Sequence, residues 1–176
     1  MRTLRAGGLV AHPTEGVWGL ACDPLQPRAV LRLLAAKRRD PDKGFILVAD
    51  SVAALTPYLA EESSKPLATA SADWPGPTTW LLPANPEIPW WLRGAHDSIA
   101  VRVSAHPLSA ALSHAYGSAL VSTSANRSGH VAAKRSWQAR DQLGQWLDML
   151  LAGDLQTPGR PSEIRDAASG RTLRSS

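Results

Sequence analysis

The sequence predicts one α/β domain over residues 1–176, in which helices cover a β-sheet. Helix, strand and helix patterns follow one another between residues 27 and 59, and such alternation is typical of a helix-covered sheet. The length of 176 residues suits a single domain, and 44% hydrophobic residues supply enough apolar side chains for a core. No internal repeat or low-complexity segment divides the chain.

The first half of the chain is expected to supply two strands and two helices. Apolar runs predict strands over residues 9–11 and 45–49. The first strand leads into a loop in which Pro13, Gly16 and Gly19 break any regular pattern, and Thr14 and Glu15 offer a hydroxyl and a carboxylate there. Helical spacing of apolar residues predicts one helix over residues 27–37. A second helix is expected over residues 52–59, where a proline would kink it.

The second half continues the alternation. Strands are predicted over residues 78–82, 99–104 and 119–121, the first of them after a rigid turn at residues 74–77. A helix over residues 107–116 should end at Gly117. Another helix should begin at Ser136 and continue with apolar residues to Leu151, and residues 161–174 should form a terminal hairpin.

Composition and motifs exclude several classes of protein. The net charge of +4 and the pI near 9.7 suit an anionic partner such as nucleotide or RNA. The single Cys22 rules out a disulfide framework, and five scattered histidines argue against a zinc hydrolase. The serine-hydrolase elbow, the P-loop and the Rossmann glycine fingerprint are absent from the sequence. With no apolar run of the ~20 residues that span a bilayer, we expect a cytoplasmic protein without a membrane partner.

Residues 37–44, termed the cationic turn, carry four cations: Lys37, Arg38, Arg39 and Lys43. Helices often end in Lys or Arg because cations complement the negative end of the helix dipole, and the Asp-Pro-Asp sequence before Gly44 predicts a turn. Two interpretations fit this pattern. The segment is either a solvated helix end or a binding site for a polyanion.

Two further polar features accompany predicted strands. Alternation places Arg102 on the less apolar face of its strand, where it needs either a protein carboxylate or an anionic ligand. Residues 122–129, termed the hydroxyl loop, contain four hydroxyls, an amide and an arginine. They follow a strand end, which is where α/β proteins usually bind ligands, although a solvated turn is the alternative.

The pair Trp90 and Trp91 suits either packing or base stacking.

Cations and hydroxyl donors at strand ends fit phosphoryl or nucleotidyl transfer, which requires phosphates to be positioned and neutralised. From Leu9 to Arg174, six segments resemble the YrdC/TsaC family, in its short single-domain form. In chain order they are Pro13-Thr14-Glu15 with Gly19; Lys37-x-Arg39 followed by Lys43; Trp74-Pro75-Gly76-Pro77-Thr78-Thr79; Val101-Arg102-Val103; Ser122-Thr123-Ser124-Ala125-Asn126; and Pro161-Ser162-Glu163-Ile164-Arg165-Asp166.

The resemblance implies a twisted, mostly parallel α/β sheet with flanking helices around a large basic cavity. It also implies an L-threonylcarbamoyladenylate synthase, a nucleotidyltransferase that makes threonylcarbamoyl-AMP and pyrophosphate from L-threonine, bicarbonate and ATP. Mg²⁺ would arrive with the ATP, and no tightly bound cofactor or dedicated metal site is expected. Partner proteins of the TsaD, TsaB and TsaE type would transfer the group to adenosine in tRNA.

The resemblance assigns roles to eleven residues. Lys37 and Arg39 would be catalytic. The nucleotide would be bound by Lys37, Arg39, Lys43, Ser98, Ser124, Asn126 and Arg174. Threonine or its carbamate would be bound by Thr14, Arg102, Ser122 and Ser162. Arg38, which the motif leaves unspecified, should face solvent.

The sequence departs from the family at two places. Only eleven residues precede His12, so a helix that usually precedes the first strand should be shortened or absent, and the natural start of the chain could lie upstream. Asp40 occupies a position where the family often has proline.

Two other functions compete with the synthase: a non-catalytic module that binds tRNA or double-stranded RNA, and a carbamoyl-transfer domain of a hydrogenase maturation factor.

Overall fold

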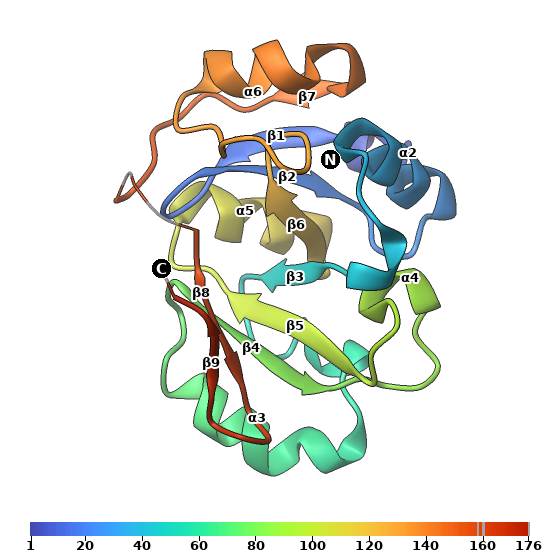
Figure 1. Ribbon diagram of the computed structural model, residues 1–176, viewed down its shortest axis with the longest axis vertical. Coiled ribbons are helices and arrows are strands. Elements are labelled where there is room, and N and C mark those ends of the chain that lie inside the picture. Colours follow the sequence, from blue (N-terminus) through green and yellow to red (C-terminus); the bar gives the residue numbers. More distant parts are fainter. Residues whose placement is uncertain (158, 160, 176) are drawn as a thin grey trace.

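A computed structural model describes residues 1–157, 159 and 161–175 of the chain. Within these residues, nine strands form one strongly twisted sheet in the order β7-β1-β2-β6-β3-β5-β4-β8-β9 (Figure 1). The strands are β1 (Val10–Pro13), β2 (Trp18–Cys22), β3 (Ile46–Ala49), β4 (Thr78–Pro83), β5 (Ser98–Val103), β6 (Leu120–Ser124), β7 (Met149–Leu150), β8 (Glu163–Asp166) and β9 (Thr172–Arg174).

The predicted α/β class is confirmed, but the sheet is mixed rather than mostly parallel. Among the described strands, five neighbouring pairs are antiparallel and three are parallel. Residues 14–17 join β1 to β2, and residues 167–171 join β8 to β9. Connections this short produce antiparallel hairpins, because parallel neighbours need a long crossover.

In the part of the chain that the structure describes, six α-helices flank the sheet (Figure 1). They are α1 (Arg2–Arg5), α2 (Pro27–Lys37), α3 (Ser64–Ser71), α4 (Trp90–Arg93), α5 (Pro107–Tyr116) and α6 (Ser136–Leu143). The helices predicted over residues 27–37 and 107–116 are confirmed at both ends, and Gly117 ends α5 in the left-handed conformation. At the N-terminus, α1 has four residues.

Three expectations about elements were wrong. The helix expected over residues 52–59 is a series of turns with one 3₁₀ turn, Thr56–Tyr58, because Pro57 lacks the amide hydrogen that a longer helix would use. The helix that begins at Ser136 ends at Leu143, and residues 149–150 instead form β7 beside β1. Strand β2 was not predicted, because Gly16 and Gly19 suggested a loop.

The core lies between the sheet and its helices. Helix α2 buries Ala29, Val30, Leu33 and Ala36 on one face, and the strands contribute Leu20, Leu47, Val101 and Val121 to the same cluster. Because neighbouring residues of a strand face opposite sides, Ser98, Ala100 and Arg102 share the other face of β5. No helix of the described residues is both long and apolar enough to cross a membrane.

Trp90 and Trp91 at α4 differ in their surroundings. The indole of Trp91 donates a hydrogen bond to the Pro24 carbonyl at 3.1 Å, and its side chain packs on the core. Trp90 contacts Trp91 edge to face, with ring centroids 6.1 Å apart, and remains 54% exposed. Of the two interpretations of this pair, packing therefore applies to Trp91.

Candidate anion-binding cavity

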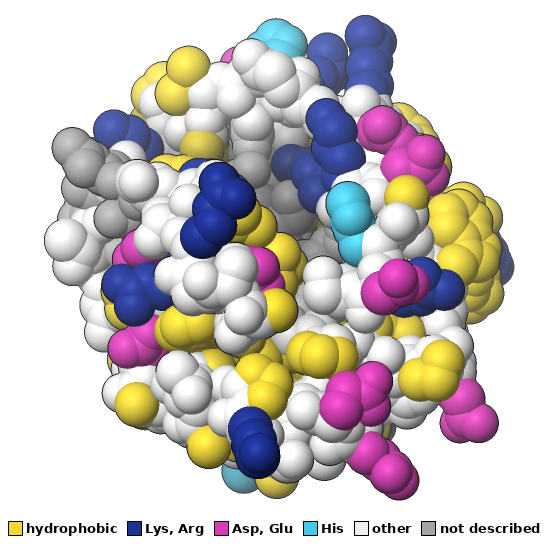
Figure 2. All heavy atoms as spheres, turned by 60° about the horizontal axis from the view of Figure 1, so that its bottom comes forward, with side chains coloured by type: hydrophobic (Ala, Val, Ile, Leu, Met, Phe, Trp, Pro, Cys, Tyr) yellow, Lys and Arg dark blue, Asp and Glu magenta, His cyan; other side chains and the backbone are white. Residues whose placement is uncertain are grey.

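One cavity of about 520 Å³ is lined by most of the residues predicted for the site. It opens on the sheet face that carries Ser98, Ala100 and Arg102, and Figure 2 shows Lys and Arg side chains beside a hollow in one face of the molecule. Nine of the eleven predicted residues line this cavity: Thr14, Arg39, Lys43, Ser98, Arg102, Ser122, Ser124, Ser162 and Arg174. Lys37 and Asn126 do not line it.

The cationic turn is fixed by close backbone packing. Asp40 accepts a hydrogen bond from the Asp42 amide at 3.0 Å and so begins the 3₁₀ turn Pro41–Lys43. The Ala95 amide donates to the Asp42 carbonyl at 3.0 Å. A Cβ atom on Gly94 would lie 2.1 Å from the Asp42 carbonyl oxygen, and Gly94 has a φ of 65°. Only glycine allows this approach, and the contact presents Arg39 and Lys43 to the cavity.

Three cations in the cavity wall form no ion pair with a carboxylate of the described residues: Arg39, Lys43 and Arg174. Arg39 lies over the Phe45 ring, with its Cζ 5.3 Å from the centroid, and donates to the Gly44 carbonyl at 2.8 Å. Burial lowers the pKa of Arg174, and the charges of Arg102 and Arg39 lower it further. The guanidinium groups therefore repel one another across the cavity, which an anion would relieve.

Lys37 has a different environment from the one expected. Its ammonium nitrogen is buried at the end of α2 and donates to the carbonyl oxygens of Ser124 at 2.5 Å and Asn126 at 2.7 Å. Burial, with a smaller contribution from Arg39, lowers the pKa of Lys37 to about 7. The described geometry uses Lys37 to hold the hydroxyl loop. Arg38 is exposed, as predicted.

The first three residues of the hydroxyl loop, 122–124, belong to a strand and not to a loop. Ser122 and Ser124 belong to β6 and line the cavity, whereas the Asn126 side chain turns back to its own loop. The Asn126 amide nitrogen donates to the carbonyls of Arg127 at 2.9 Å and His130 at 2.6 Å. Lys37 and Asn126 thus hold this loop from two sides, which positions Ser124 at the cavity wall.

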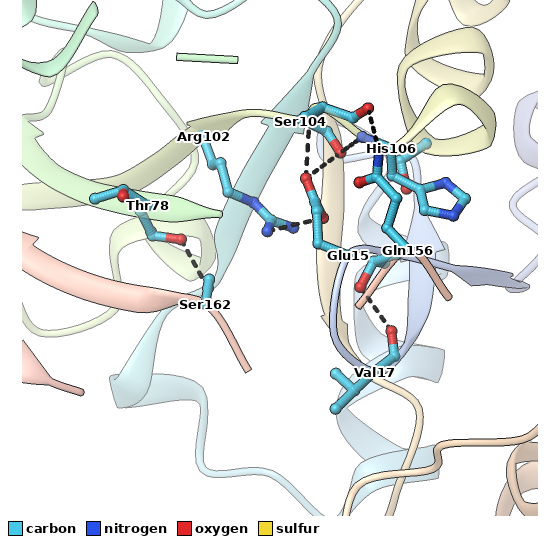
Figure 3. A network of polar contacts seen from close by, with 12 residues as sticks. Glu15, Val17, Thr78, Arg102, Ser104, His106, Gln156 and Ser162 are labelled. Carbon is cyan, nitrogen blue, oxygen red and sulfur yellow. Dashed lines mark hydrogen bonds and ion pairs between the residues drawn. The ribbon is translucent and has the colours of Figure 1, made fainter. Parts of the chain in front are cut away.

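Arg102 has a protein carboxylate as its partner, which resolves the alternative left open by the sequence. Its Nη1 lies 3.0 Å from Oε2 of Glu15, and both side chains are at least 90% buried (Figure 3). The other Glu15 oxygen accepts hydrogen bonds from Ser104 Oγ at 2.8 Å and the Ala105 amide at 3.0 Å. Nothing in the sequence pairs these two residues, although a buried strand arginine requires a carboxylate or ligand.

Ser162 and Thr14 complete this side of the cavity. Ser162 Oγ lies 2.9 Å from Thr79 Oγ1, and Arg174 donates to the Ser162 carbonyl at 2.7 Å. The Thr14 hydroxyl donates to the Val17 carbonyl at 2.6 Å, which closes the turn between β1 and β2. No group of three or more His, Cys, Asp or Glu side chains that could hold a metal occurs in the described part of the chain.

Fold and cavity together define an α/β protein whose curved, mixed sheet encloses a basic pocket. The chain belongs to the Sua5/YciO/YrdC family, because the family model described as "Telomere recombination" matches residues 2–176. It is 51% identical over 175 residues to a threonylcarbamoyl-AMP synthase of Alkalilimnicola ehrlichii, covering 97% of this chain and 90% of the relative. A protein of the same name from Methylococcus capsulatus is 52% identical over 172 residues, covering 97% and 92%.

Solved structures share the fold of this chain. A crystal structure of P. abyssi Sua5 complexed with L-threonine matches with a TM-score of 0.87 at 30% identity, covering 94% of this chain and 48% of that one. The chain thus spans about half of that longer protein. E. coli YciO, at 23% identity and a TM-score of 0.78, shares the fold and is covered to 80%.

Proposed function

We propose that this chain is a threonylcarbamoyl-AMP synthase, a nucleotidyltransferase that uses L-threonine, bicarbonate and ATP. The observation that carries the proposal is one cavity in which three cations without an ion pair among the described residues lie beside the Glu15-paired Arg102 and a set of hydroxyls. The relatives named above support it, since about half of all residues are identical over nearly the whole length.

The unpaired cations suit the triphosphate of ATP. Arg39, Lys43 and Arg174 would neutralise phosphate oxygens and the charge that develops at the attacked phosphorus. Ser98 and Ser124 would hold the nucleotide from the strand ends. Mg²⁺ would arrive with the phosphates, because hard cations of this kind commonly bind through substrate phosphates.

The opposite side of the cavity suits the amino acid. Arg102 would face the carboxylate or carbamate of threonine, with hydroxyl contacts from Thr14, Ser122 and Ser162. The threonine amine attacks the carbon of bicarbonate, and water leaves to give a carbamate. A carbamate oxygen then attacks the α-phosphorus, the bond to the β-phosphate oxygen breaks, and pyrophosphate departs. These two ligands must lie side by side, since correct placement supplies much of the rate.

The structure supports an indirect role for two predicted residues. Lys37 and Asn126 would act on the nucleotide through the hydroxyl loop, because their polar atoms bond to backbone groups of that loop. The product would pass in the cytoplasm to proteins of the TsaD, TsaB and TsaE type, which place the group on tRNA.

The test is pyrophosphate release by the purified protein with ATP, Mg²⁺, L-threonine and bicarbonate, and with each component omitted. The synthase releases pyrophosphate only when both L-threonine and bicarbonate are present. No release under any condition, together with RNA binding that weakens in Arg39→Ala, would replace the synthase by the RNA-binding function.

A further inference from the structure

Glu15 is a buried carboxylate that does not line the cavity. It lies in the turn of residues 14–17 between β1 and β2 and is only 7% exposed. An ionised side chain at such a place is costly unless it is paired. Its backbone carbonyl also accepts a hydrogen bond from the Thr157 amide at 2.8 Å, so the turn is attached to Thr157.

The Glu15 carboxylate connects the Arg102 side chain to Ser104 and Ala105, which lie just beyond the end of β5. Oε2 pairs with the Arg102 guanidinium, and Oε1 is held by Ser104 and Ala105, which follow Arg102 in the chain (Figure 3). Burial would raise the pKa of Glu15, but the charge of Arg102 and these hydrogen bonds outweigh it, so the net pKa is lowered. The carboxylate therefore stays ionised and its position is fixed.

This arrangement leaves donors of Arg102 for a ligand. Oε2 of Glu15 forms an ion pair with Nη1, and neither Oε2 nor Nε of Arg102, both buried, has a hydrogen-bond partner among the described residues. Two arginines that line the cavity have a carboxylate partner among the described residues: Arg102 has the buried Glu15, and Arg93 has the fully exposed Asp97. The Glu15–Arg102 pair is close to net neutral, in contrast to Arg39, Lys43 and Arg174.

We propose that Glu15 is a positioning residue that fixes the Arg102 guanidinium at the cavity wall and cancels its excess charge. A fixed, neutralised arginine can still bind one carboxylate through its remaining donors, but it attracts a polyphosphate less than an unpaired cation does. Glu15 thereby directs the amino acid to Arg102 and the triphosphate to the unpaired cations. This inference rests on the proposed synthase function, in which both ligands occupy one cavity.

The test is steady-state kinetics of Glu15→Gln, which keeps an oxygen acceptor for Ser104 and Ala105 but removes the charge. We expect the KM for L-threonine to rise roughly tenfold or more, the effect of losing a fixed charged contact. The KM for ATP at low ATP should stay within about twofold of wild type. High ATP should then inhibit the variant competitively with threonine, because an unpaired Arg102 attracts phosphate.

Two further variants make the result specific. Glu163→Gln makes the same change in another ion pair, with Arg165 at 3.0 Å on β8, and should leave both KM values unchanged. Glu15→Asp keeps the charge at a shorter reach, so it should raise the threonine KM by less than Glu15→Gln does, and it replaces that variant if Glu15→Gln does not fold.

The inference is overturned if Glu15→Gln leaves the threonine KM unchanged, or if it lowers kcat alone or raises both KM values equally. A wild-type protein without threonine-dependent pyrophosphate release would overturn the proposed function itself. Failure of the function is therefore seen in the wild type, whereas failure of the inference is seen only in the variant.

Discussion

The ammonium nitrogen of Lys37 lies 2.7 Å from the carbonyl oxygen of Asn126, 89 residues further along the chain. A second bond, to the Ser124 carbonyl, and a bond from the Ser128 amide to the Lys37 carbonyl complete this junction. The end of α2 is thereby joined to the hydroxyl loop. The cationic turn and the loop that contribute to one cavity are thus held in a fixed relative position.

Replacing Lys37 by methionine should destabilise the protein. The variant keeps the aliphatic length but removes the donor from the Asn126 carbonyl and one of two donors from the Ser124 carbonyl, which costs about 1–3 kcal/mol in the free energy of unfolding. Urea unfolding measures this loss. Lys65→Met, on an exposed position of α3, is the control and should change the free energy by less than about 0.5 kcal/mol. Equal effects of the two substitutions would show that Lys37 does not hold the loop.

Lys37 should also make stability depend on pH. Its pKa is about 7 in the folded protein, below the ordinary value of 10.5. Between these values the unfolded chain binds the proton and the folded chain does not, so this residue's contribution to stability rises with pH, by at most ~1.4 kcal/mol per pH unit. The difference in unfolding free energy between wild type and Lys37→Met should therefore increase from neutral to alkaline pH. A constant difference would contradict this expectation.

Arg39→Ala should impair ATP use without unfolding the protein. Losing one charged contact to phosphate costs about 1.5–3 kcal/mol, which corresponds to roughly a 10- to 100-fold loss in kcat/KM for ATP. The neighbouring Arg38 is exposed and lies outside the cavity, so Arg38→Ala is the matched control and should retain wild-type kcat/KM. Similar losses in both variants would indicate a general effect of charge instead of contact by Arg39.

Gly94→Ala should displace the cationic turn. Its Cβ would collide with the Asp42 carbonyl, and the left-handed φ adds further strain. Gly170 also has a positive φ but no heavy atom near its Cβ position, so Gly170→Ala should cost only the conformational strain of about 1–2 kcal/mol. Calorimetric unfolding and ATP kinetics should show a larger loss of stability and activity for Gly94→Ala. Equal losses would mean that the close contact is unimportant.

Local patterns predicted much of the fold. Helices α2 and α5 have clear amphipathic spacing, proline at their first position and a left-handed residue just beyond the last turn, so both ends could be predicted. Strand β2 could not, because Gly16 and Gly19 disfavour strands locally and the pairing of β2 with β1 and β6 is what stabilises it. Strand β7 has two residues and depends on its pairing with β1.

The composition of the site was more predictable than its contacts. Residue types and motif order identified nine side chains that line one cavity. The sequence could not show that Lys37 points to backbone carbonyls, because the distance between α2 and the hydroxyl loop depends on tertiary packing. The pairing of Arg102 with Glu15 likewise depends on how β1, β2 and β5 are placed.

The most direct test of the account is mass spectrometry of the product formed from ATP, L-threonine and isotope-labelled bicarbonate. If the cavity joins a carbamate of threonine to the α-phosphate of ATP, the product is threonylcarbamoyl-AMP and carries the label in its carbamoyl carbon. An unlabelled threonyl adenylate, or AMP without any adduct, would contradict the account.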